Sequence, residues 1–254
     1  MSIKTHLPNV LTCLNLLCGC FALTLILDFD WRNHLDALSL QPSYFTFAWQ
    51  QLVHASLLIG IAAVADFFDG LVARALHVSS PIGKDLDSLA DMVSFGVVPG
   101  AILFKLLQHV LADTNLPEVL AYGAFLVSIF SALRLAKFNN DTRQTTSFIG
   151  LPTPACTLVV ASLPLILAHD SFHVSSFILN PWVLLGLTAL LSGLLVAEIP
   201  LFALKFKNLS WQDNGVQFVF LLLTVALLLG MQATAIPLIV LLYVLLSMLR
   251  PSMG

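Results

Sequence analysis

Apolar stretches long enough to cross a lipid bilayer recur along the whole chain and limit its fold more than any other feature. A membrane-spanning helix needs roughly 20 predominantly apolar residues. The sequence therefore predicts an all-α fold, a polytopic membrane bundle of about eight transmembrane helices. The stretches are Leu7–Leu27, Leu52–His77, Pro81–His109, Val119–Asn139, Pro152–Ala168, Pro181–Ile199, Val216–Gly230 and Ala233–Leu249.

The composition favours a membrane protein over a soluble one. Hydrophobic residues make up 58% of the chain and charged residues 10%, whereas a soluble domain is about 45–50% apolar and about 25% charged. The net charge of −3 and the absence of a basic run argue against a nucleic-acid partner. No internal repeat is evident and no connection is long enough for a soluble domain, so we expect residues 1–254 to form one membrane domain.

The positions of lysine and arginine predict the orientation of the bundle. If the eight stretches alternate across the membrane, only Arg32 and Lys105 of the 11 basic residues lie on one side. The positive-inside rule makes the other side cytoplasmic, with both termini there. The first stretch follows Lys4 in the manner of a signal peptide, but its length and regularly spaced polar residues predict a retained span. We expect an integral protein of a bacterial cytoplasmic membrane.

One short window, DFFDGLVARALHVSSPIGKDLDSLAD, holds five of the 14 acidic residues. Asp66 and Asp69 are three residues apart at the end of the second stretch, and Asp87 and Asp91 are four apart at the start of the third. Each pair therefore shares a helix face, and the short joint makes the two helices antiparallel neighbours. We expect these four carboxylates to converge at the cytoplasmic surface, with Asp85 pointing elsewhere.

Four carboxylates in one small volume predict a metal site. Their mutual repulsion and desolvation are severe, and Arg74 alone cannot neutralise them. An all-oxygen ligand set suits Mg²⁺ or Mn²⁺, with Ca²⁺ also possible, rather than zinc or copper. Four acids suit two ions, an arrangement fitted to displacement at phosphorus. The alternative, a set of solvated loop acids, fits poorly because all four lie in register on two helix ends.

Small residues and an arginine accompany these acids. Gly70, Ala73 and Gly83 remove side-chain bulk from the same surface, which lets a flat group or a pyrophosphate approach the backbone. Arg74 can hold a phosphate oxygen through its forked guanidinium group.

The whole pattern, Asp66-x2-Asp69-Gly70-x2-Ala73-Arg74-x8-Gly83-x3-Asp87-x3-Asp91, resembles the signature of the CDP-alcohol phosphotransferase family. Eight residues at set spacings make the match specific. The resemblance implies that the aspartates bind two divalent metal ions around the pyrophosphate of a CDP-linked donor. It also implies that Asp91 is the general base and that the glycines and the alanine line the cytidine site.

Three further stretches resemble the phosphatidylserine synthase branch of that family, namely LPNVLTCLNLLCG, DMVSFGVVPG and ALRLAKFNNDTRQTTSFIGLPTPA. This resemblance implies an enzyme that converts CDP-diacylglycerol and L-serine to phosphatidylserine and CMP. It also implies a homodimer. One departure is Lys137, where many relatives carry arginine, so the positive charge is kept but the forked geometry is lost.

Two groups of polar residues outside the window are candidates for substrate binding. Asn9, Thr12 and Asn15 share one face of the first stretch, where they either hold CDP-diacylglycerol or form packing bonds between helices. The second group can bind the serine carboxylate or the donor phosphates, or can anchor the protein to lipid headgroups. It comprises Arg134, Lys137, Asn139 and Arg143.

Two other functions stay open at the level of the sequence. The same chemistry can use another alcohol, such as glycerol 3-phosphate or an inositol phosphate, although few basic residues are spare for an extra phosphate. A cation transporter can also use intramembrane aspartates, but these usually lie near the bilayer midplane rather than at one surface.

Overall fold

The computed structural model describes residues 6–28, 43–78, 80–140, 148–202 and 211–249. Within this part the chain is almost wholly helical, as predicted. The helices are α1 Leu7–Leu27, α3 Ser43–Ala75, α4 Pro81–Asp91, η2 Met92–Val97, α5 Val98–Ala112, η3 Glu118–Phe125, α6 Leu126–Asn140, α7 Thr153–His169, α8 Ser175–Ile178, α9 Pro181–Val196, α10 Trp211–Met231, η4 Gln232–Thr234 and α11 Ala235–Leu249. The two short strands are β1 Phe148–Ile149 and β2 Pro200–Leu201.

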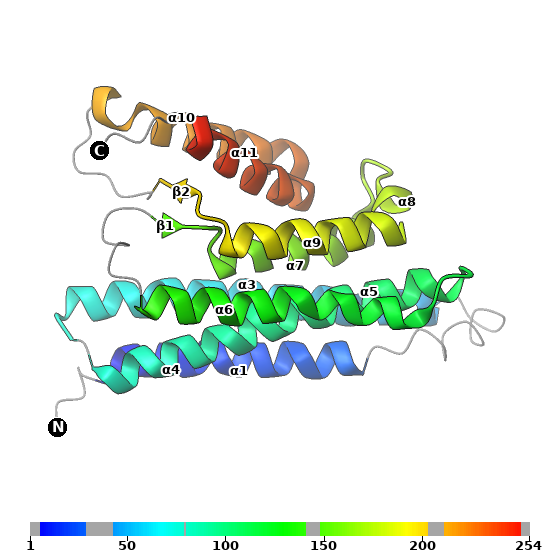
Figure 1. Ribbon diagram of the computed structural model, residues 1–254, viewed down its shortest axis with the longest axis horizontal. Helices are drawn as coiled ribbons and strands as arrows, with labels where there is room; N and C mark the ends of the chain where they lie inside the picture. Colours follow the sequence, from blue (N-terminus) through cyan, green and yellow to red (C-terminus); the bar gives the residue numbers. More distant parts are fainter. Residues whose placement is uncertain (1–5, 29–42, 79, 141–147, 203–210, 250–254) are drawn as a thin grey trace.

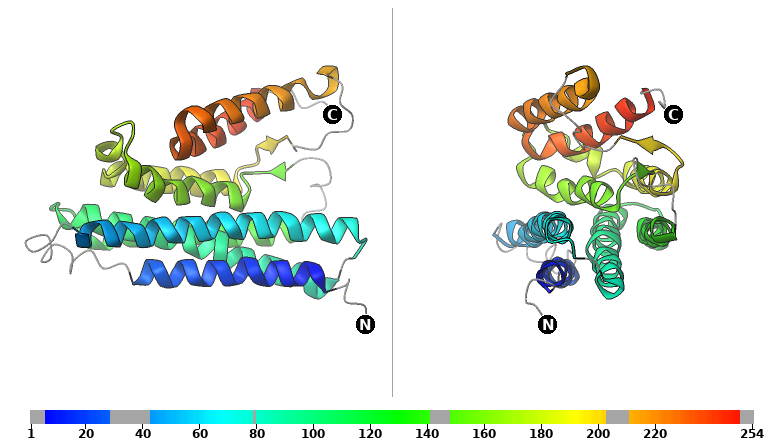
Figure 2. Two further views of the ribbon diagram at one scale, coloured as in Figure 1. Left: turned by 180° about the vertical axis from the view of Figure 1, so that it is seen from behind. Right: turned by 90° about the vertical axis from the view of Figure 1, so that its left-hand side faces the viewer.

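The helices pack side by side in a bundle (Figure 1). Helices α1, α3, α4, α5 and α6 form its lower part, α7 and α9 lie above them, and the α10–α11 hairpin lies on top, an arrangement that the views in Figure 2 also show. The core follows α5, where Ile102, Leu103, Leu106 and Leu107 are fully buried. The packing of the bundle brings α1, α3 and α4 together, since α1 contacts both α3 and α4.

The joint between α3 and α4 is short, since α3 ends at Ala75 and α4 begins at Pro81. His77 adopts a left-handed φ of 52°, and the amides of His77 and Val78 donate to the carbonyls of Arg74 and Ala73, which is the Schellman pattern of a helix C-terminus. Ser80 then caps α4 by accepting from the amide of Gly83 at 3.0 Å. These local bonds turn the chain back at the end of α3 and place α4 beside it.

The third predicted span is one long helix interrupted by a π-helical segment, η2. Pro99 explains the interruption, because proline has no amide to donate to the carbonyl four residues earlier and its ring crowds that carbonyl. The carbonyl in question belongs to Phe95, and it accepts a hydrogen bond from Thr157 of α7 at 2.8 Å. The next carbonyl, that of Gly96, accepts from Ser128 of α6 at 2.8 Å. Neighbouring helices thus satisfy backbone groups that a regular α-helix would satisfy itself.

The two short strands tie the end of α9 to the segment before α7. They pair antiparallel, with Phe148 opposite Leu201 and Ile149 opposite Pro200. Gly150 follows with a φ of 76°, and an added Cβ atom there would lie 2.7 Å from the carbonyl oxygen of Leu195. Only glycine fits this turn, which lies at the same end of the bundle as the α3–α4 joint (Figure 1).

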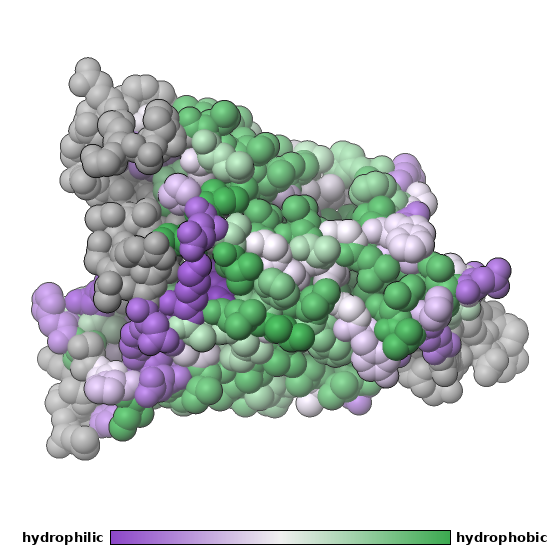
Figure 3. All heavy atoms as spheres, viewed as in Figure 1, coloured by the Kyte–Doolittle hydropathy of each residue, from purple (hydrophilic) through white to green (hydrophobic). Residues whose placement is uncertain are grey.

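The surface matches a protein embedded in a membrane. In Figure 3 apolar residues cover the middle of the visible face, and hydrophilic residues gather towards both ends. Within the described part of the chain, five helical stretches are long and apolar enough to cross a bilayer: Leu7–Leu27, Trp49–Ala75, Pro81–Ala112, Glu118–Asn140 and Asn214–Leu249. These make the chain an integral membrane protein.

The predicted count of eight spans is therefore supported only in part. Each predicted stretch is helical, but α7 and α9 have 17 and 16 residues, which is short for a span. The last two predicted spans fall within the single apolar stretch Asn214–Leu249. A turn nevertheless separates them, because Gln232 has a left-handed φ of 49° and α10 contacts α11.

Candidate active site

Two of the predicted carboxylates project from the last turns of α3. Asp66 and Asp69 lie three residues apart and so face the same way. Asp69 is only 6% exposed, and the hydroxyl of Thr12 on α1 lies 2.7 Å from its Oδ2 atom. Thr12 also lies 3.1 Å from the carbonyl of Pro8, one turn earlier. Helix α1 therefore orients one carboxylate of the pair.

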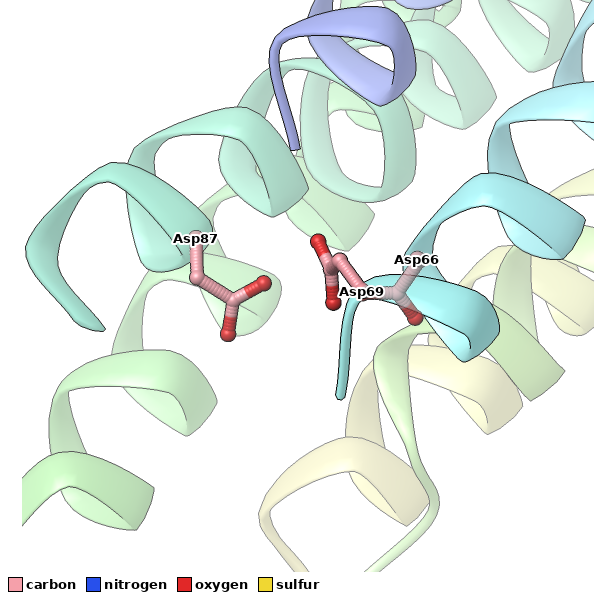
Figure 4. Close-up of side chains that lie close together, drawn as sticks. All are labelled: Asp66, Asp69 and Asp87. Atoms are coloured by element: carbon pink, nitrogen blue, oxygen red, sulfur yellow. The ribbon is translucent and has the colours of Figure 1, made fainter. Parts of the chain in front are cut away.

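Asp87 brings a third carboxylate from α4. Figure 4 shows it pointing from α4 towards Asp66 and Asp69 on α3. One carboxylate oxygen from each of the three residues lies within 4.8 Å of the other two. The Oδ1 atom of Asp87 is buried and has no hydrogen-bond partner. A buried, unsatisfied carboxylate oxygen beside two further carboxylates is the arrangement that a bound cation would complete.

Asp91, the fourth predicted carboxylate, lies one turn beyond Asp87 and at the edge of this cluster. Its Oδ1 atom accepts a hydrogen bond from Asn15 of α1 at 3.1 Å, and its carboxylate lies close enough to Asp66 for the two charges to interact. Asn15 is fully buried and its Oδ1 atom has no partner. Asp91 is thus fixed by α1 on one side and faces the α3 carboxylates on the other.

The basic side chains that the structure describes offset the charge of this cluster only in part, since Arg74 alone interacts with the charge of Asp69. Among the described residues, none of the three clustered carboxylates forms an ion pair with lysine or arginine. Repulsion between partly desolvated carboxylates is strong enough to require protons or a cation. Carboxylate oxygens from two antiparallel helices form a ligand set that suits a hard divalent cation such as Mg²⁺ or Mn²⁺. Asp85, expected to point elsewhere, is exposed and outside the cluster.

The small residues of the motif lie beside the acids. Gly70 is near the guanidinium group of Arg74, since an added Cβ atom would lie 3.4 Å from its Nη1 atom. Gly83 faces Asn9 of α1, whose Oδ1 atom would lie 3.1 Å from an added Cβ atom. Ala73 is partly buried. The first turns of α1 and α4 thus approach each other with little side-chain bulk between them.

The four residues predicted to bind serine or phosphate are in very different surroundings. Arg134 is 7% exposed, its Nε atom has no partner, and it lies close enough to Asp91 to interact with its charge. Lys137 instead forms a 2.9 Å ion pair with Glu198, beyond the end of α9. Asn139 donates to Ser88 of α4 at 2.8 Å. Arg143 lies outside the described residues.

Several residues that organise the site were not predicted. Thr12 and Asn15 were expected either to hold CDP-diacylglycerol or to form packing bonds between helices, and both do bond other helices, Thr12 to Asp69 and Asn15 to Asp91. That these partners are the motif carboxylates themselves was not predicted. The π-helical segment after Asp91 and the bond from Thr157 were missed altogether. The signal for the segment was Pro99, which cannot donate to the carbonyl of Phe95. The partner of Lys137, Glu198, is distant in sequence and left no local signal.

A comparison with protein families bears directly on this arrangement. The family model for CDP-alcohol phosphatidyltransferase matches residues 5–192, which include all four aspartates. The chain belongs to this family. The match confirms the family expected from the spacing of the aspartates, glycines and arginine.

Individual relatives agree with this membership. The chain is 30% identical over 194 residues to a CDP-diacylglycerol–serine O-phosphatidyltransferase of Bacillus subtilis, covering 76% of this chain and 88% of the relative. It is 31% identical over 212 residues to the protein of that name from Helicobacter pylori, covering 82% and 84%. A relative of the same name from Saccharomyces cerevisiae is 32% identical over 167 residues, covering 62% and 53%. The similarity therefore extends well beyond the acidic motif.

Proposed function

We propose that this protein transfers the phosphatidyl group of CDP-diacylglycerol to L-serine, giving phosphatidylserine and CMP. The observation that carries the proposal is the cluster of Asp66, Asp69 and Asp87, with oxygens within 4.8 Å of one another, in a chain of the CDP-alcohol phosphatidyltransferase family. The names of the relatives from Bacillus subtilis and Helicobacter pylori support serine as the acceptor.

In this reaction the serine hydroxyl attacks the phosphorus that carries diacylglycerol. A new O–P bond forms, the pyrophosphate P–O bond breaks, and CMP leaves. Asp91 accepts the hydroxyl proton as general base. Its bond from Asn15 supports this role, because it holds one carboxylate oxygen in place and fixes the direction of the other. Arg134 adds a positive charge beside Asp91.

The carboxylates of Asp66, Asp69, Asp87 and Asp91 would hold the divalent cations, two Mg²⁺ or Mn²⁺ ions, with Ca²⁺ as a possible substitute. The buried, unpartnered Oδ1 atom of Asp87 supports this assignment. Such ions, when bound, neutralise the pyrophosphate and stabilise the leaving group.

The donor would bind over the small residues of the motif. Gly70, Ala73 and Gly83 leave the backbone open to the nucleotide and the pyrophosphate, and Arg74 is exposed near Gly70, where it can fork onto a phosphate oxygen. Asn9 faces Gly83 and is the residue of α1 best placed for the nucleotide. Thr12 and Asn15 act mainly by orienting the carboxylates, since each already bonds one of them.

The acceptor site favours an alcohol without a phosphate. Arg134 is buried and has a free Nε atom for the serine carboxylate. The charge of Lys137 is already balanced by Glu198, which leaves little positive charge for a phosphorylated acceptor. Asn139 borders the site through Ser88, and Arg143 is a further candidate for the carboxylate or a phosphate.

We place the protein in a bacterial cytoplasmic membrane with its eight helices spanning the bilayer, both termini in the cytoplasm and the aspartates at the cytoplasmic surface. The distribution of lysine and arginine supports this orientation. The acyl chains of the donor would enter sideways from the lipid. The family resemblance supports a homodimer formed within the membrane.

The test is CMP release by the purified protein in mixed micelles of CDP-diacylglycerol with Mg²⁺ or Mn²⁺. We expect release that depends on L-serine and stops when the metal is chelated. Release that depends on glycerol 3-phosphate or an inositol phosphate, but not on serine, would overturn the acceptor. No release with any alcohol, together with divalent-cation flux in proteoliposomes, would favour a transporter.

A further inference from the structure

The helix that carries Asp91 changes its winding immediately after that residue. Helix α4 ends at Asp91, and the next six residues, Met92–Val97, form the π-helical segment η2. Such segments are rare and are frequent at functional sites. Their geometry has to be stabilised from outside the helix, because the wider turn leaves backbone groups without their usual partners.

One external partner of this segment, besides Ser128 of α6, is Thr157 on α7. Its side chain is fully buried, and its hydroxyl lies 2.8 Å from the carbonyl oxygen of Phe95. In a regular helix that carbonyl would accept from residue 99, but residue 99 is proline and has no amide hydrogen. The same hydroxyl lies 2.9 Å from the carbonyl of Thr153, the common bond of a threonine to its own helix. The contact with Phe95 is the unusual one, since it bridges two helices.

A second path connects the π-helical segment to the carboxylate of Asp91. Ser94, in the middle of the segment, donates to the backbone carbonyl of Asn15 at 3.0 Å. Asn15 in turn donates to Asp91 at 3.1 Å. Gly19 lets the two helices come this close, because an added Cβ atom would lie only 3.0 Å from the Cα atom of Ser94. The position of the segment therefore determines where Asn15 holds Asp91.

We propose that Thr157 is a positioning residue for Asp91. By holding the carbonyl of Phe95, its hydroxyl keeps η2 in its π-helical form, and this form sets Ser94 against α1 and Asp91 against the α3 carboxylates. Thr157 acts on Asp91 only through other residues, because its hydroxyl contacts the carbonyls of Phe95 and Thr153. The inference rests on the proposed role of Asp91 as general base and metal ligand.

The test uses the nearly isosteric variant Thr157→Val, which removes the hydroxyl and with it the contacts with Phe95 and Thr153, and Thr157→Ser, which keeps the hydroxyl. Thr188→Val is the matched control, because Thr188 is also buried but bonds only the carbonyl of Leu184 in its own helix. A misplaced catalytic group typically lowers the rate about 100-fold. We expect Thr157→Val to lower kcat by about 10- to 100-fold, with the KM for CDP-diacylglycerol unchanged and with activity restored in Thr157→Ser.

A second readout separates positioning from a loss of stability. The Mg²⁺ concentration for half-maximal activity, and the rise in melting temperature on adding Mg²⁺, depend on the placement of Asp91 rather than on the amount of folded protein. We expect Thr157→Val to need more Mg²⁺ and to be stabilised less by it than Thr188→Val. Equal values in the two valine variants, or a loss of yield with unchanged kcat in the folded fraction, would overturn the proposal.

Pro99→Ala provides a variant that should not weaken the fold. Alanine returns the missing amide and is the better helix former, so η2 can close towards an α-helix without Thr157. We expect a lower kcat at equal or higher melting temperature, and full activity in Pro99→Ala would contradict the need for the π-helical form.

If the wild-type protein releases no CMP with any alcohol, the proposed function fails. If the wild type is active and Thr157→Val matches it, only this inference fails.

Discussion

At the scale of the residue, the four motif aspartates are not equivalent. Asp87 has a buried oxygen without a partner, whereas Asp69 and Asp91 are each held by a polar residue of α1. The carboxylate without a protein partner is the one most dependent on a cation, and the two that are held are already oriented. This difference separates ligands that a metal must organise from ligands that the fold has organised in advance.

The role of Asp91 can be tested by Asp91→Asn, which keeps the shape of the side chain and removes its basicity. We expect CMP release to fall by about 10²- to 10⁴-fold, the usual contribution of general base catalysis, while the protein still inserts and folds. Asp85→Asn is the matched control, because Asp85 is exposed and outside the cluster. Wild-type activity in Asp91→Asn would contradict the assignment.

The two basic residues of α6 should respond differently to the same substitution. Arg134 is buried with a free Nε atom, and a hydrogen bond to a charged group contributes about 1.5–3 kcal/mol. We therefore expect Arg134→Met to lower kcat/KM for serine at least about tenfold. Lys137 pairs with Glu198 in a partly exposed position, and such pairs contribute about 0–1 kcal/mol.

Lys137→Met should consequently change kcat/KM for serine by less than about fivefold. Steady-state assays at varied serine concentration measure both effects, and Glu198→Gln controls for loss of the ion pair alone. A larger effect of Lys137→Met than of Arg134→Met would show that the lysine, rather than the arginine, holds the acceptor.

At the scale of the element, close helix approach positions the site. Gly19 on α1 lies against Ser94 of η2, and Gly100 of α5 lies against Ser128 of α6. Small residues at helix contacts let the backbones of membrane helices approach closely. Close packing matters there because no hydrophobic driving force acts between helices in lipid. Here the close approach also brings Asn15 to Asp91.

Gly19→Ala tests this contact. An added methyl group would force α1 and η2 apart, and overpacking of this kind costs about 1–3 kcal/mol. We expect a lower melting temperature in detergent together with reduced CMP release. Gly60→Ala is the control, because a Cβ atom added at Gly60 would have no atom within 4 Å apart from its chain neighbours and the backbone of its own helix. If both variants melt and react alike, the Gly19 contact does not position the site.

At the scale of the whole molecule, the acidic cluster lies at one end of the bundle. The start of α1, the α3–α4 joint and the β1–β2 pair share that end, and the turn before α8 lies at the other (Figure 1). If the end with the aspartates faces the cytoplasm, soluble serine reaches the site from the cell interior while the lipid donor comes from the membrane.

Single cysteines at the two ends test this orientation. Asp85 and Ser171 are exposed, the first in α4 and the second in the turn before α8, which lie at opposite ends of the bundle (Figure 1). Each can be replaced by cysteine in a background lacking Cys13, Cys18, Cys20 and Cys156. In right-side-out vesicles we expect an impermeant thiol reagent to label Ser171→Cys but not Asp85→Cys. Both should be labelled after permeabilisation, and the reverse pattern in intact vesicles would invert the topology.

The sequence by itself determined the class of the protein and the chemistry of its site. Long apolar stretches dictate membrane helices because an unpaired backbone is too costly in lipid, and the spacing of Asp66, Asp69, Asp87 and Asp91 dictates shared helix faces. These patterns are local, so they can be read without knowing which helices touch. The family followed from the same spacing.

Only the tertiary structure decided which residues support that chemistry. Thr12 and Asn15 reach Asp69 and Asp91 across 57 and 76 positions of sequence, and Thr157 reaches Phe95 across 62. Such bonds depend on helix packing, which no periodicity in the sequence specifies. The missing amide of Pro99 can be read from the sequence. That the hydroxyl of Thr157 takes its place cannot, because this contact depends on where α7 packs against the helix that carries the site.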